Sequence, residues 1–337
     1  MEDLFTKVNA FASSGLDCAR NDELNRMNIY YDIEDFKKVP NAVVTIGTFD
    51  GVHRGHQAIL KNMVNRAKET DGESVVVTFY PHPRQVLSHD AGIRFISTQE
   101  EKIQHLESLG IDNLIIIKFT KEFAAISSED FIKDFIVKNI QPAILVIGYD
   151  HHFGKGRTGD FGMLYELGNQ YHFKVEKIQE QDVDDMAVSS TKIRHFLEDG
   201  DIRHANLLLG YEFSYTGKVI HGQQVGQKMG YPTANIDVAE EFQLIEKPGV
   251  YATYVDFEGQ SYPAMTYIGK RPTMHDNRPQ SIEAHILDFD QDLYDKEIKI
   301  RFVDFVRDDK KFDNFEALKQ QIGNDEQTII NILNNKV

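Results

Sequence analysis

The sequence has little cysteine, little positive charge and no long apolar run, and each shortage excludes a class of protein. Its single cysteine excludes an internal disulfide and suits a reducing compartment. No stretch of about 18 apolar residues is present, so neither a membrane span nor a membrane partner is expected. The chain opens on Met-Glu-Asp, which is acidic and is not followed by an apolar core, so a secretory signal is not expected. These features predict a cytoplasmic protein.

The shortage of positive charge bears on the partners of the protein. The formal net charge is −16 at pH 7. A nucleic-acid partner needs a basic face, so nucleic-acid binding is not expected. Nucleotide binding is not excluded, because Mg²⁺, helix N-termini and a few local arginines or lysines can supply the positive field that ATP needs.

The length and the apolar content are sufficient for two cores. The chain has 337 residues, of which 41% are hydrophobic and 27% are charged, as in an ordinary globular protein. Because one domain commonly holds about 100–200 residues, two domains are expected. The sequence carries no signal for an oligomeric state.

Residues 43–60 predict a strand, a glycine-rich turn and a helix. Val43–Ile46 is an apolar, β-branched run typical of a buried parallel strand, and Gly47 ends it. From about His56 onward the apolar residues recur at helical spacing. In an open parallel sheet such a turn lies at the carboxyl end of a strand, where ligands bind. The helix would point its free N–H groups into the same space.

Two histidines, His53 and His56, stand in this turn with Gly55 between them. An imidazole can donate a hydrogen bond or carry charge toward a phosphate oxygen, and glycine lets the backbone approach a bulky anion. The alternative is a metal pair. A zinc site would need at least one more ligand, and the single cysteine, Cys18, is far away in the sequence, so no zinc is expected.

Strand and helix signals alternate up to about residue 210, which predicts a parallel sheet with helices on both faces. Residues 1–27 show little periodicity and are expected to be a weakly structured extension. Strands are expected at 28–31, 74–79, 114–119, 143–148 and 174–178, and helices at 100–109, 128–137 and 161–171.

Two further loops of this half carry candidate ligand-binding residues. Residues 78–84 read Thr-Phe-Tyr-Pro-His-Pro-Arg, and the two prolines stiffen a turn that places His82 and Arg84 near the crevice. The alternative for this segment is a rigid surface turn. Residues 148–159 contain four glycines with a lysine and an arginine, which favours an anion-facing loop, although glycine-rich connections are also ordinary.

The segment 188–194 precedes another predicted helix. Its Ser189, Ser190 and Thr191 are candidate N-caps, and their hydroxyls together with the helix N-terminus could grip a phosphate. Arg194 lies one turn further along the same face.

Beyond Leu207–Tyr211 the period changes to that of an antiparallel β region. Strand-like segments follow one another with short polar turns, and five or more strands over about 95 residues favour a small closed barrel. The strands are expected at 213–221, 249–257, 261–268, 281–288 and 297–306, and helices follow at 315–321 and 326–333.

A series of glycines opens the barrel region. Gly222, Gly226 and Gly230 recur every four residues and Pro232 follows, which indicates a loop able to lie against phosphates rather than a helix. Thr233 and Asn235 offer a hydroxyl and a carbonyl oxygen, which are hard ligands suited to Mg²⁺. Their spacing of two places both on one face of a strand.

The N-terminal half resembles the bacterial FAD synthetases, a branch of the His-x-Gly-His nucleotidylyltransferases. The string Gly-Thr-Phe-Asp-Gly-Val-His-Arg-Gly-His at 47–56 carries the resemblance, and the motifs at 78–83, 148–154 and 189–194 extend it. The resemblance implies a Rossmann-like nucleotidylyltransferase domain. It assigns His53, His56 and Arg194 to catalysis at the ATP phosphates. It further implies ATP or phosphate contacts at Gly47, Phe49, Asp50, Gly55, Asp150, Ser190 and Thr191, and flavin contacts at Pro81, His82 and Pro83.

The C-terminal half resembles the bacterial riboflavin kinases. After the glycine series and Pro-Thr-Ala-Asn come Pro-Gly-Val-Tyr at 248–251, Ile-Gly-Lys-Arg-Pro-Thr at 268–273 and a strand glutamate, Glu283. The resemblance makes Glu283 the catalytic base, which would accept a proton from a primary alcohol; a solvated strand glutamate is the alternative. Gln227, Met229 and Tyr267 depart from the family pattern. The resemblance implies flavin contact at Arg271, ATP contacts at Gly217, Lys218, Gly222, Gly226, Gly230 and Pro232, and Mg²⁺ at Thr233 and Asn235.

Taken together, the two resemblances imply a bifunctional enzyme of flavin cofactor synthesis. An FMN adenylyltransferase domain is expected at 28–208 and a riboflavin kinase domain at 209–337, with riboflavin, FMN, FAD and ATP as substrates and products and with Mg²⁺ as cofactor. One rival is an adenylyltransferase for another phosphorylated substrate, which would have no need of the barrel. A second rival is a non-catalytic flavin carrier, which would not require Glu283, Thr233 and Asn235 together with both histidines.

Overall fold

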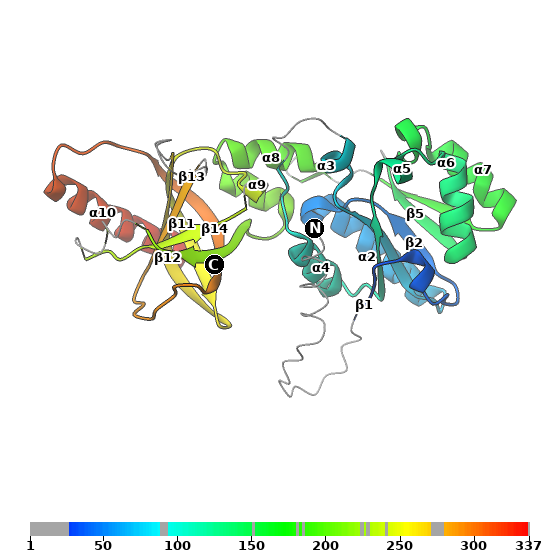
Figure 1. Ribbon diagram of the computed structural model, residues 1–337, viewed down its shortest axis with the longest axis horizontal. Coiled ribbons are helices and arrows are strands. Elements are labelled where there is room, and N and C mark those ends of the chain that lie inside the picture. Colours follow the sequence, from blue (N-terminus) through cyan, green and yellow to red (C-terminus); the bar gives the residue numbers. More distant parts are fainter. Residues whose placement is uncertain are drawn as a thin grey trace.

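The protein is described by a computed structural model that covers residues 27–87, 94–149, 152–179, 182–183, 186–222, 226, 230–239, 242–270 and 280–335. Two bodies lie side by side along its long axis, an α/β domain and a β-barrel (Figure 1). The extension at 1–26 and the site residues Asp150 and Arg271 lie outside the described residues. Within the described ranges, no helix is both long and apolar enough to cross a membrane.

The α/β domain is built on a six-stranded sheet in the order β1-β4-β3-β2-β5-β6, and all its pairings are parallel. This confirms the predicted parallel sheet. The central strands are short β-branched runs buried on both faces, as a parallel sheet covered by helices requires. Its strands are β1 (Asn28–Tyr30), β2 (Val43–Ile46), β3 (Ser74–Tyr80), β4 (Asn113–Lys118), β5 (Ile144–Gly148) and β6 (Lys174–Ile178).

Helices cover both faces of this sheet, and each face has its own apolar cluster. On one face Leu60 and Met63 of α2 (Arg54–Glu69) and Leu106 of α4 (Gln99–Ser108) pack over the sheet. On the other face the covering side chains come from the π-helical turn η3 (Phe131–Val137) and from α7 (Phe161–Tyr171). The shorter elements are η1 (Ile33–Asp35), η2 (Asp50–Val52), α3 (Pro83–Leu87), α5 (Lys121–Ala124), α6 (Ser128–Asp130), η4 (Lys155–Arg157), β7 (Asp182–Val183) and β8 (Met186–Ala187).

The C-terminal body is a closed barrel in the order β10-β13-β12-β11-β14-β9, with antiparallel pairings. The predicted small closed barrel is confirmed. The short strand β10, which follows the glycine series and Pro232, was not among the predicted strands. The strands are β9 (Ser214–Ile220), β10 (Ala234–Asp237), β11 (Gly249–Phe257), β12 (Gln260–Lys270), β13 (Gln280–Ile286) and β14 (Glu297–Asp308).

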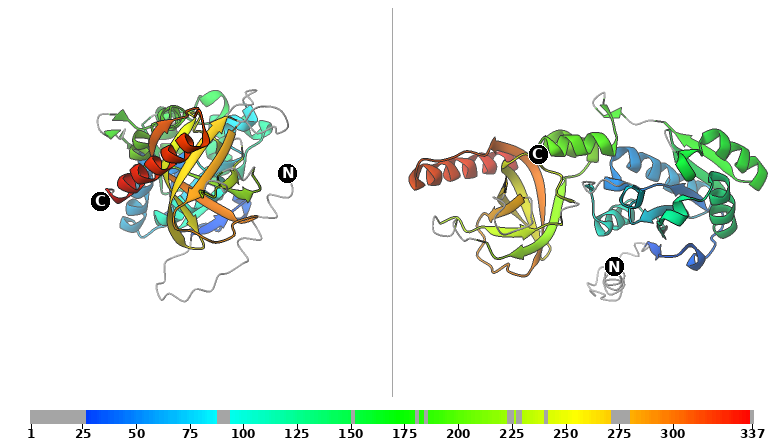
Figure 2. Two further views of the ribbon diagram at one scale, coloured as in Figure 1. Left: turned by 90° about the vertical axis from the view of Figure 1, so that its left-hand side faces the viewer. Right: turned by 45° about the horizontal axis from the view of Figure 1, so that its top comes forward.

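One long helix, α10 (Phe315–Asn334), covers part of the outer face of the barrel (Figure 2). Its Ile329 and Leu333 pack on outward-facing side chains of the strands, including Val250. The sequence predicts two helices here, but the structure joins them. Asp325, in the segment between the two predictions, is buried and accepts hydrogen bonds from Arg307 of β14, which holds this segment in the helix.

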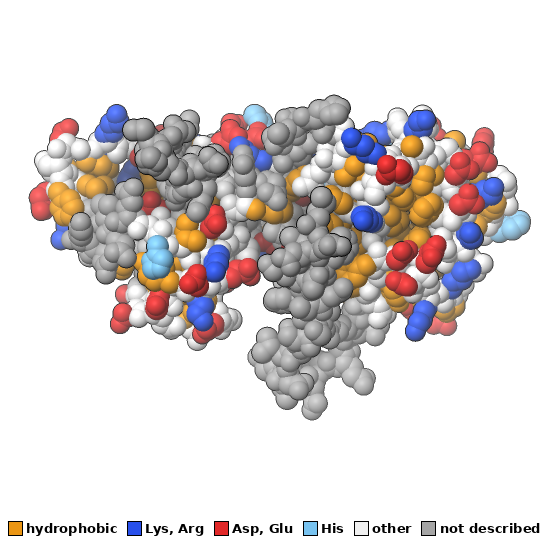
Figure 3. All heavy atoms as spheres, in the orientation of Figure 1, with side chains coloured by type: hydrophobic (Ala, Val, Ile, Leu, Met, Phe, Trp, Pro, Cys, Tyr) orange, Lys and Arg blue, Asp and Glu red, His pale blue; other side chains and the backbone are white. Residues whose placement is uncertain are grey.

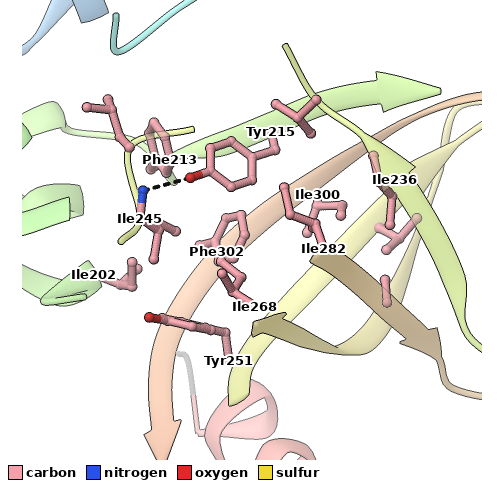
Figure 4. Close-up of a cluster of buried hydrophobic side chains, with 14 of the residues drawn as sticks. Ile202, Phe213, Tyr215, Ile236, Ile245, Tyr251, Ile268, Ile282, Ile300 and Phe302 are labelled. Atoms are coloured by element: carbon pink, nitrogen blue, oxygen red, sulfur yellow. Dashed lines mark hydrogen bonds between the residues drawn. The ribbon is translucent and has the colours of Figure 1, made fainter. Parts of the chain in front are cut away.

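The helices α8 (Ser190–Glu198) and α9 (Ile202–Leu209) lie between the two bodies and share a core with the barrel. Figure 4 shows Ile202 of α9 beside Tyr251 and Phe302 of the barrel. The close-up also shows the hydroxyl of Tyr215 accepting a hydrogen bond from the N–H of Ile245 at 2.7 Å. From the two helices, the residues buried in this shared core are Ile193, Leu197, Ile202, Ala205, Leu208 and Leu209.

Candidate functional site

The turn after β2, which we call the histidine loop (residues 47–53), has an unusual backbone. Phe49, Gly51 and Val52 have φ of 48°, 75° and 33°, in the left-handed region that most side chains avoid. At Gly51 a Cβ atom would lie 2.7 Å from the side chain of Ile96, so glycine is required there for space as well as for conformation. The loop leads directly into α2, with His53 as its N-cap.

His53 and His56 are held together at the start of α2. The Nδ1 atom of His53 accepts a hydrogen bond from the backbone N–H of His56 at 3.3 Å. Neutral His53 therefore carries its proton on Nε2, which is the donor nitrogen left for a ligand. The two rings stack with centroids 3.7 Å apart, and the ring of Phe49 meets the edge of His56. In the part of the chain that the structure describes, the buried Nδ1 of His56 has no hydrogen-bond partner.

Burial keeps these imidazoles neutral. Desolvation lowers the pKa of His53 to about 4, with the cation Arg194 adding to the effect. Desolvation likewise lowers the pKa of His56 well below its ordinary value, and that of His82, whose ring lies beside Phe95, to about 3. Among the described residues, no group of three or more His, Cys, Asp and Glu side chains is arranged to hold a metal ion. The pair is therefore available as neutral hydrogen-bond donors.

An ion pair between Arg194 of α8 and Asp50 lies beside the histidines. The side chains are 13% and 4% exposed, so the pair is largely withdrawn from water. Asp50 also accepts the backbone N–H groups of Ile96 at 3.1 Å and Ser97 at 3.4 Å, and Arg194 Nε donates to the carbonyl of Arg94 at 3.0 Å. Because protein donors occupy the carboxylate of Asp50, that group orients Arg194 rather than presenting itself to an anion.

A cleft with two lobes opens along the histidine loop. The polar lobe, of about 390 Å³, is lined by both histidines, by Arg194 and by the N-terminus of α8. The apolar lobe, of about 740 Å³, continues from it. On the face of the molecule shown in Figure 3, hydrophobic side chains gather over this domain. Both lobes are lined by Thr48, His56, Ile59, Pro83, Arg84, Gly148 and Arg157.

Aromatic rings dominate the apolar lobe. Phe79 of β3, Phe119 after β4 and Phe123 of α5 lie within 6 Å of one another, measured between ring centroids. Phe131 extends the group, with its centroid 5.9 Å from that of Phe123. At about 740 Å³ the lobe lies within the usual range of about 300–1,000 Å³ for ligand sites, and its rings suit a flat, apolar group.

A second group of polar residues lies on the outside of the barrel. Asn235 of β10 is opposite Glu283 of β13, and Glu283 is opposite Tyr267 of β12. Their strand neighbours Ile236 and Ala284 point into the barrel core, so the three residues form a row on the outer face. The row runs toward the part of the outer face that α10 covers.

Thr233 completes this row. Its Oγ1 donates to Oε2 of Glu283 at 3.4 Å. A Cβ atom at Gly222 would lie 2.1 Å from the Asn235 amide, so glycine lets the incoming loop lie directly against that side chain. Nδ1 of His285 donates to the carbonyl of Pro232 at 2.8 Å, which fixes the turn that leads into β10.

The remaining residues predicted for the barrel site are placed in different ways. Lys218 pairs with Asp295 at 3.0 Å on the surface, with both side chains more than half exposed. Gly217 packs against the backbone of Asp237, and Gly226 lies against the carbonyl of Tyr231. Gly230 adopts φ of 84° with open space around it. The departures Gln227 and Met229 lie outside the described residues.

Two family models match this chain. Residues 35–192 match the model of the FAD synthetase family, and residues 209–333 match that of the riboflavin kinase family. The bifunctional riboflavin kinase/FMN adenylyltransferase of Escherichia coli (strain K12) is 34% identical over 305 residues, which are 90% of this chain and 96% of that protein. The chain belongs to the bifunctional riboflavin kinase/FMN adenylyltransferase family. The predicted resemblance and the predicted class of transferase are confirmed.

Other members of the bifunctional family give the same result. The proteins of the same description from Listeria monocytogenes and Pseudomonas fluorescens are 36% and 37% identical over 85% and 84% of this chain, and over 91% and 90% of their own lengths. A solved structure described as a macrolide-efflux protein from Streptococcus pneumoniae superposes with a TM-score of 0.82. It is 29% identical and covers 90% of this chain and 99% of that one.

The structure brings together most of the residues predicted for the FAD synthetase region. Gly47, Phe49, Asp50, Gly55, Pro83, Ser190 and Thr191 line the cleft with the two histidines, His82 and Arg194, whereas Pro81 is not among the residues that line the two lobes. The phenylalanines of the apolar lobe were not predicted from the sequence. The run Phe119, Phe123 and Phe131 after a strand was the available signal. Asp150 and Arg271 have no described position.

Proposed function

We propose that this chain makes FMN from riboflavin and FAD from FMN, each with ATP. The observation that carries the proposal is the presence in one chain of two separate reactive groups. One is the stacked pair His53 and His56 above a polar lobe, and the other is Glu283 beside Thr233 and Asn235 on the barrel. Each lies in a region that matches the corresponding family.

In the α/β domain, the polar lobe would take the phosphates of ATP and the apolar lobe the flavin ring of FMN. The FMN phosphate oxygen attacks the α-phosphorus, and the bond to the pyrophosphate leaving group breaks. The nucleophile is already anionic, so no base is needed. Nε2–H of His53 and the preorganised Arg194 stabilise the charge that develops on the phosphate oxygens. His56, whose buried Nδ1 lacks a partner among the described residues, supports the same role.

On the barrel, the 5′-hydroxyl of riboflavin attacks the γ-phosphorus of ATP, and ADP leaves. Glu283 accepts the hydroxyl proton as the new bond forms. The hydroxyl of Thr233 and the amide oxygen of Asn235 are hard donors on the same face as Glu283, and they fit Mg²⁺. When bound with ATP, Mg²⁺ would neutralise phosphate charge.

We also place the division of labour near residue 208, with FAD synthesis before it and riboflavin phosphorylation after it, and the extension at 1–27 outside both. The two family matches, which end at 192 and begin at 209, support this division. A cytoplasmic location is supported by the single cysteine and by the supply of ATP there.

Isotope labelling tests both activities in one assay. The protein is incubated with riboflavin and Mg²⁺ and with ATP labelled at either the γ- or the α-phosphate, and the flavins are separated by chromatography. The γ-label should enter FMN and FAD, and the α-label should enter FAD alone. Flavin that is bound but not converted would contradict the proposal and favour a flavin carrier.

A further inference from the structure

The histidine loop depends on its surroundings for its shape. The left-handed φ of Phe49 and especially of the β-branched Val52 is unfavourable. Such a backbone persists only where neighbouring groups hold it. The groups that hold this loop therefore control where His53 and His56 stand.

Each backbone carbonyl from residue 50 to residue 53 accepts a hydrogen bond. Three of these bonds come from the α/β domain and from α8. The donors are Ser190 Oγ to Asp50 at 3.2 Å, Gln57 Nε2 to Val52 at 2.9 Å, and Gln57 N to His53 at 2.9 Å.

The fourth bond comes from the barrel side. The hydroxyl of Tyr211 donates to the carbonyl of Gly51 at 2.6 Å. Tyr211 belongs to the segment that matches the riboflavin kinase family, two residues before Phe213 in the barrel core. Its ring stacks on His105 of α4 with centroids 4.1 Å apart, so the hydroxyl is aimed by packing.

A second hydrogen-bonding side chain connects the start of the barrel segment with the histidine loop. Gln57 Nε2, which holds Val52, also donates to the carbonyl of Leu209 at 2.8 Å. Burial raises the pKa of Tyr211 well above its ordinary value, so its hydroxyl stays protonated and remains a donor. Two donors thus connect the start of the barrel segment with two successive carbonyls of the loop.

We propose that Tyr211 is a positioning residue for adenylyl transfer: a side chain of the riboflavin kinase region fixes the loop that presents His53 and His56 in the FAD synthetase region. The inference rests on the proposed function of that loop. It predicts that the FAD synthetase region depends on the riboflavin kinase region for the position of the histidine loop, although the two reactions take place at separate sites.

The test is Tyr211→Phe in the full chain. Loss of this hydroxyl leaves a buried carbonyl unpaired, which should lower kcat for FAD formation from supplied FMN by about three- to tenfold. KM for FMN and ATP should stay within about twofold, because no substrate contact is removed. Riboflavin phosphorylation should be unchanged.

Tyr251→Phe is the matched control. It removes the same kind of bond, from a tyrosine hydroxyl to the carbonyl of Lys247 at 2.7 Å, within the same core but away from the loop. This variant should form FAD at the wild-type rate. An equal loss in both variants, or a Tyr211→Phe enzyme with wild-type kcat, would overturn the inference.

Two further arms complete the design. Gln57→Met removes the donor to Val52 and Leu209 and should show the same loss in kcat; if Tyr211→Phe does not fold, a wild-type kcat for Gln57→Met overturns the inference. Failure of the wild-type enzyme to form FAD would instead refute the proposed function, so the two failures are distinguishable.

Discussion

Arg194 and Asp50 are 144 residues apart in the sequence and form a buried ion pair beside the polar lobe. Asp50→Asn should therefore disturb the FAD-forming site, because the carboxylate of Asp50 orients Arg194. Breaking a buried pair commonly costs about 3–5 kcal/mol, so the melting temperature should fall. Misplacing Arg194 should lower FAD formation by about 10²-fold, with riboflavin phosphorylation retained.

The control for this variant is Glu176→Gln. Glu176 pairs with Arg66 outside the cleft lining, and both side chains are more than a quarter exposed. A pair that water still reaches contributes far less than a buried one, so the loss of stability should be smaller and FAD formation should hardly change. If both substitutions had the same effect on FAD formation, the specific role of Asp50 would be lost.

Glu283→Gln should remove riboflavin phosphorylation and leave FAD formation in place, the reverse of the Asp50→Asn result. The substitution keeps the shape of the side chain and removes the base, so FMN formation should fall by about 10²–10⁴-fold. FAD formation from supplied FMN should hardly change. Glu297→Gln, at an exposed position in β14, is the control. Near-normal kinase turnover in Glu283→Gln would show that this glutamate is structural.

His56→Ala should remove one preorganised group at the ATP phosphates. FAD formation at saturating ATP should fall by about 10²–10³-fold, and the kinase reaction should survive. Metal analysis of the purified wild type should find no stoichiometric zinc. Unchanged FAD synthesis, or bound zinc that disappears in the variant, would rule out the phosphate-donor assignment.

The free energy of unfolding should fall as the pH drops from about 6.5 to about 4. Burial lowers the pKa of His53 from the ordinary 6.5 to about 4 in the folded protein. Between these two pH values His53 is protonated in the unfolded chain and neutral in the folded protein. Above this window both states are neutral. Below the window the contribution of His53 to the free energy of unfolding is lost completely, which amounts to about 3 kcal/mol.

Thermal unfolding across this pH range measures the effect. In His53→Gln the melting temperature should fall less steeply as the pH drops, because one of the buried imidazoles is gone. His195→Gln, at a side chain that is 71% exposed, should leave this slope as it is. A wild-type slope in His53→Gln would mean that His53 is solvated in the folded protein.

The limits of a folded kinase fragment can be tested by truncation. A fragment from Ser189 keeps α8 and α9, whose apolar side chains share the barrel core, and should phosphorylate riboflavin without making FAD. A fragment from Leu209 exposes the surface that these helices cover. At about 1.5–3 kcal/mol for each large apolar side chain, it should melt at a lower temperature. Equal melting temperatures would contradict the shared core, and FAD made by either fragment would contradict the division of labour.

The elements that repeat locally could be predicted from the sequence. One short stretch predicts a strand at Val43–Ile46, a turn at Gly47 and a helix after His56. The histidine pair could therefore be placed between the strand and the helix from the sequence alone. The outer row of the barrel was predictable in part, because the spacing of Thr233 and Asn235 already puts both on one face.

What depends on remote segments could not be predicted. No local pattern tells that Arg194 meets Asp50, or that the hydroxyl of Tyr211 meets Gly51. The continuity of α10 likewise depends on Arg307, a residue of another element that pairs with Asp325 in the middle of the helix. These contacts are set by tertiary packing, which overrides local preference.

Helix α8 contributes both to the ion pair beside the polar lobe and to the barrel core, and this limits which sequence changes the helix tolerates. Arg194 must face Asp50, while Ile193 and Leu197 must face the barrel core. One residue inserted between 194 and 197 would turn everything after it by about 100° relative to everything before it. Either the ion pair or the core would then be lost. The helix can therefore tolerate substitutions, but not insertions or deletions between these residues. Its length fixes the rotation of the residues that face one catalytic half relative to those that face the other.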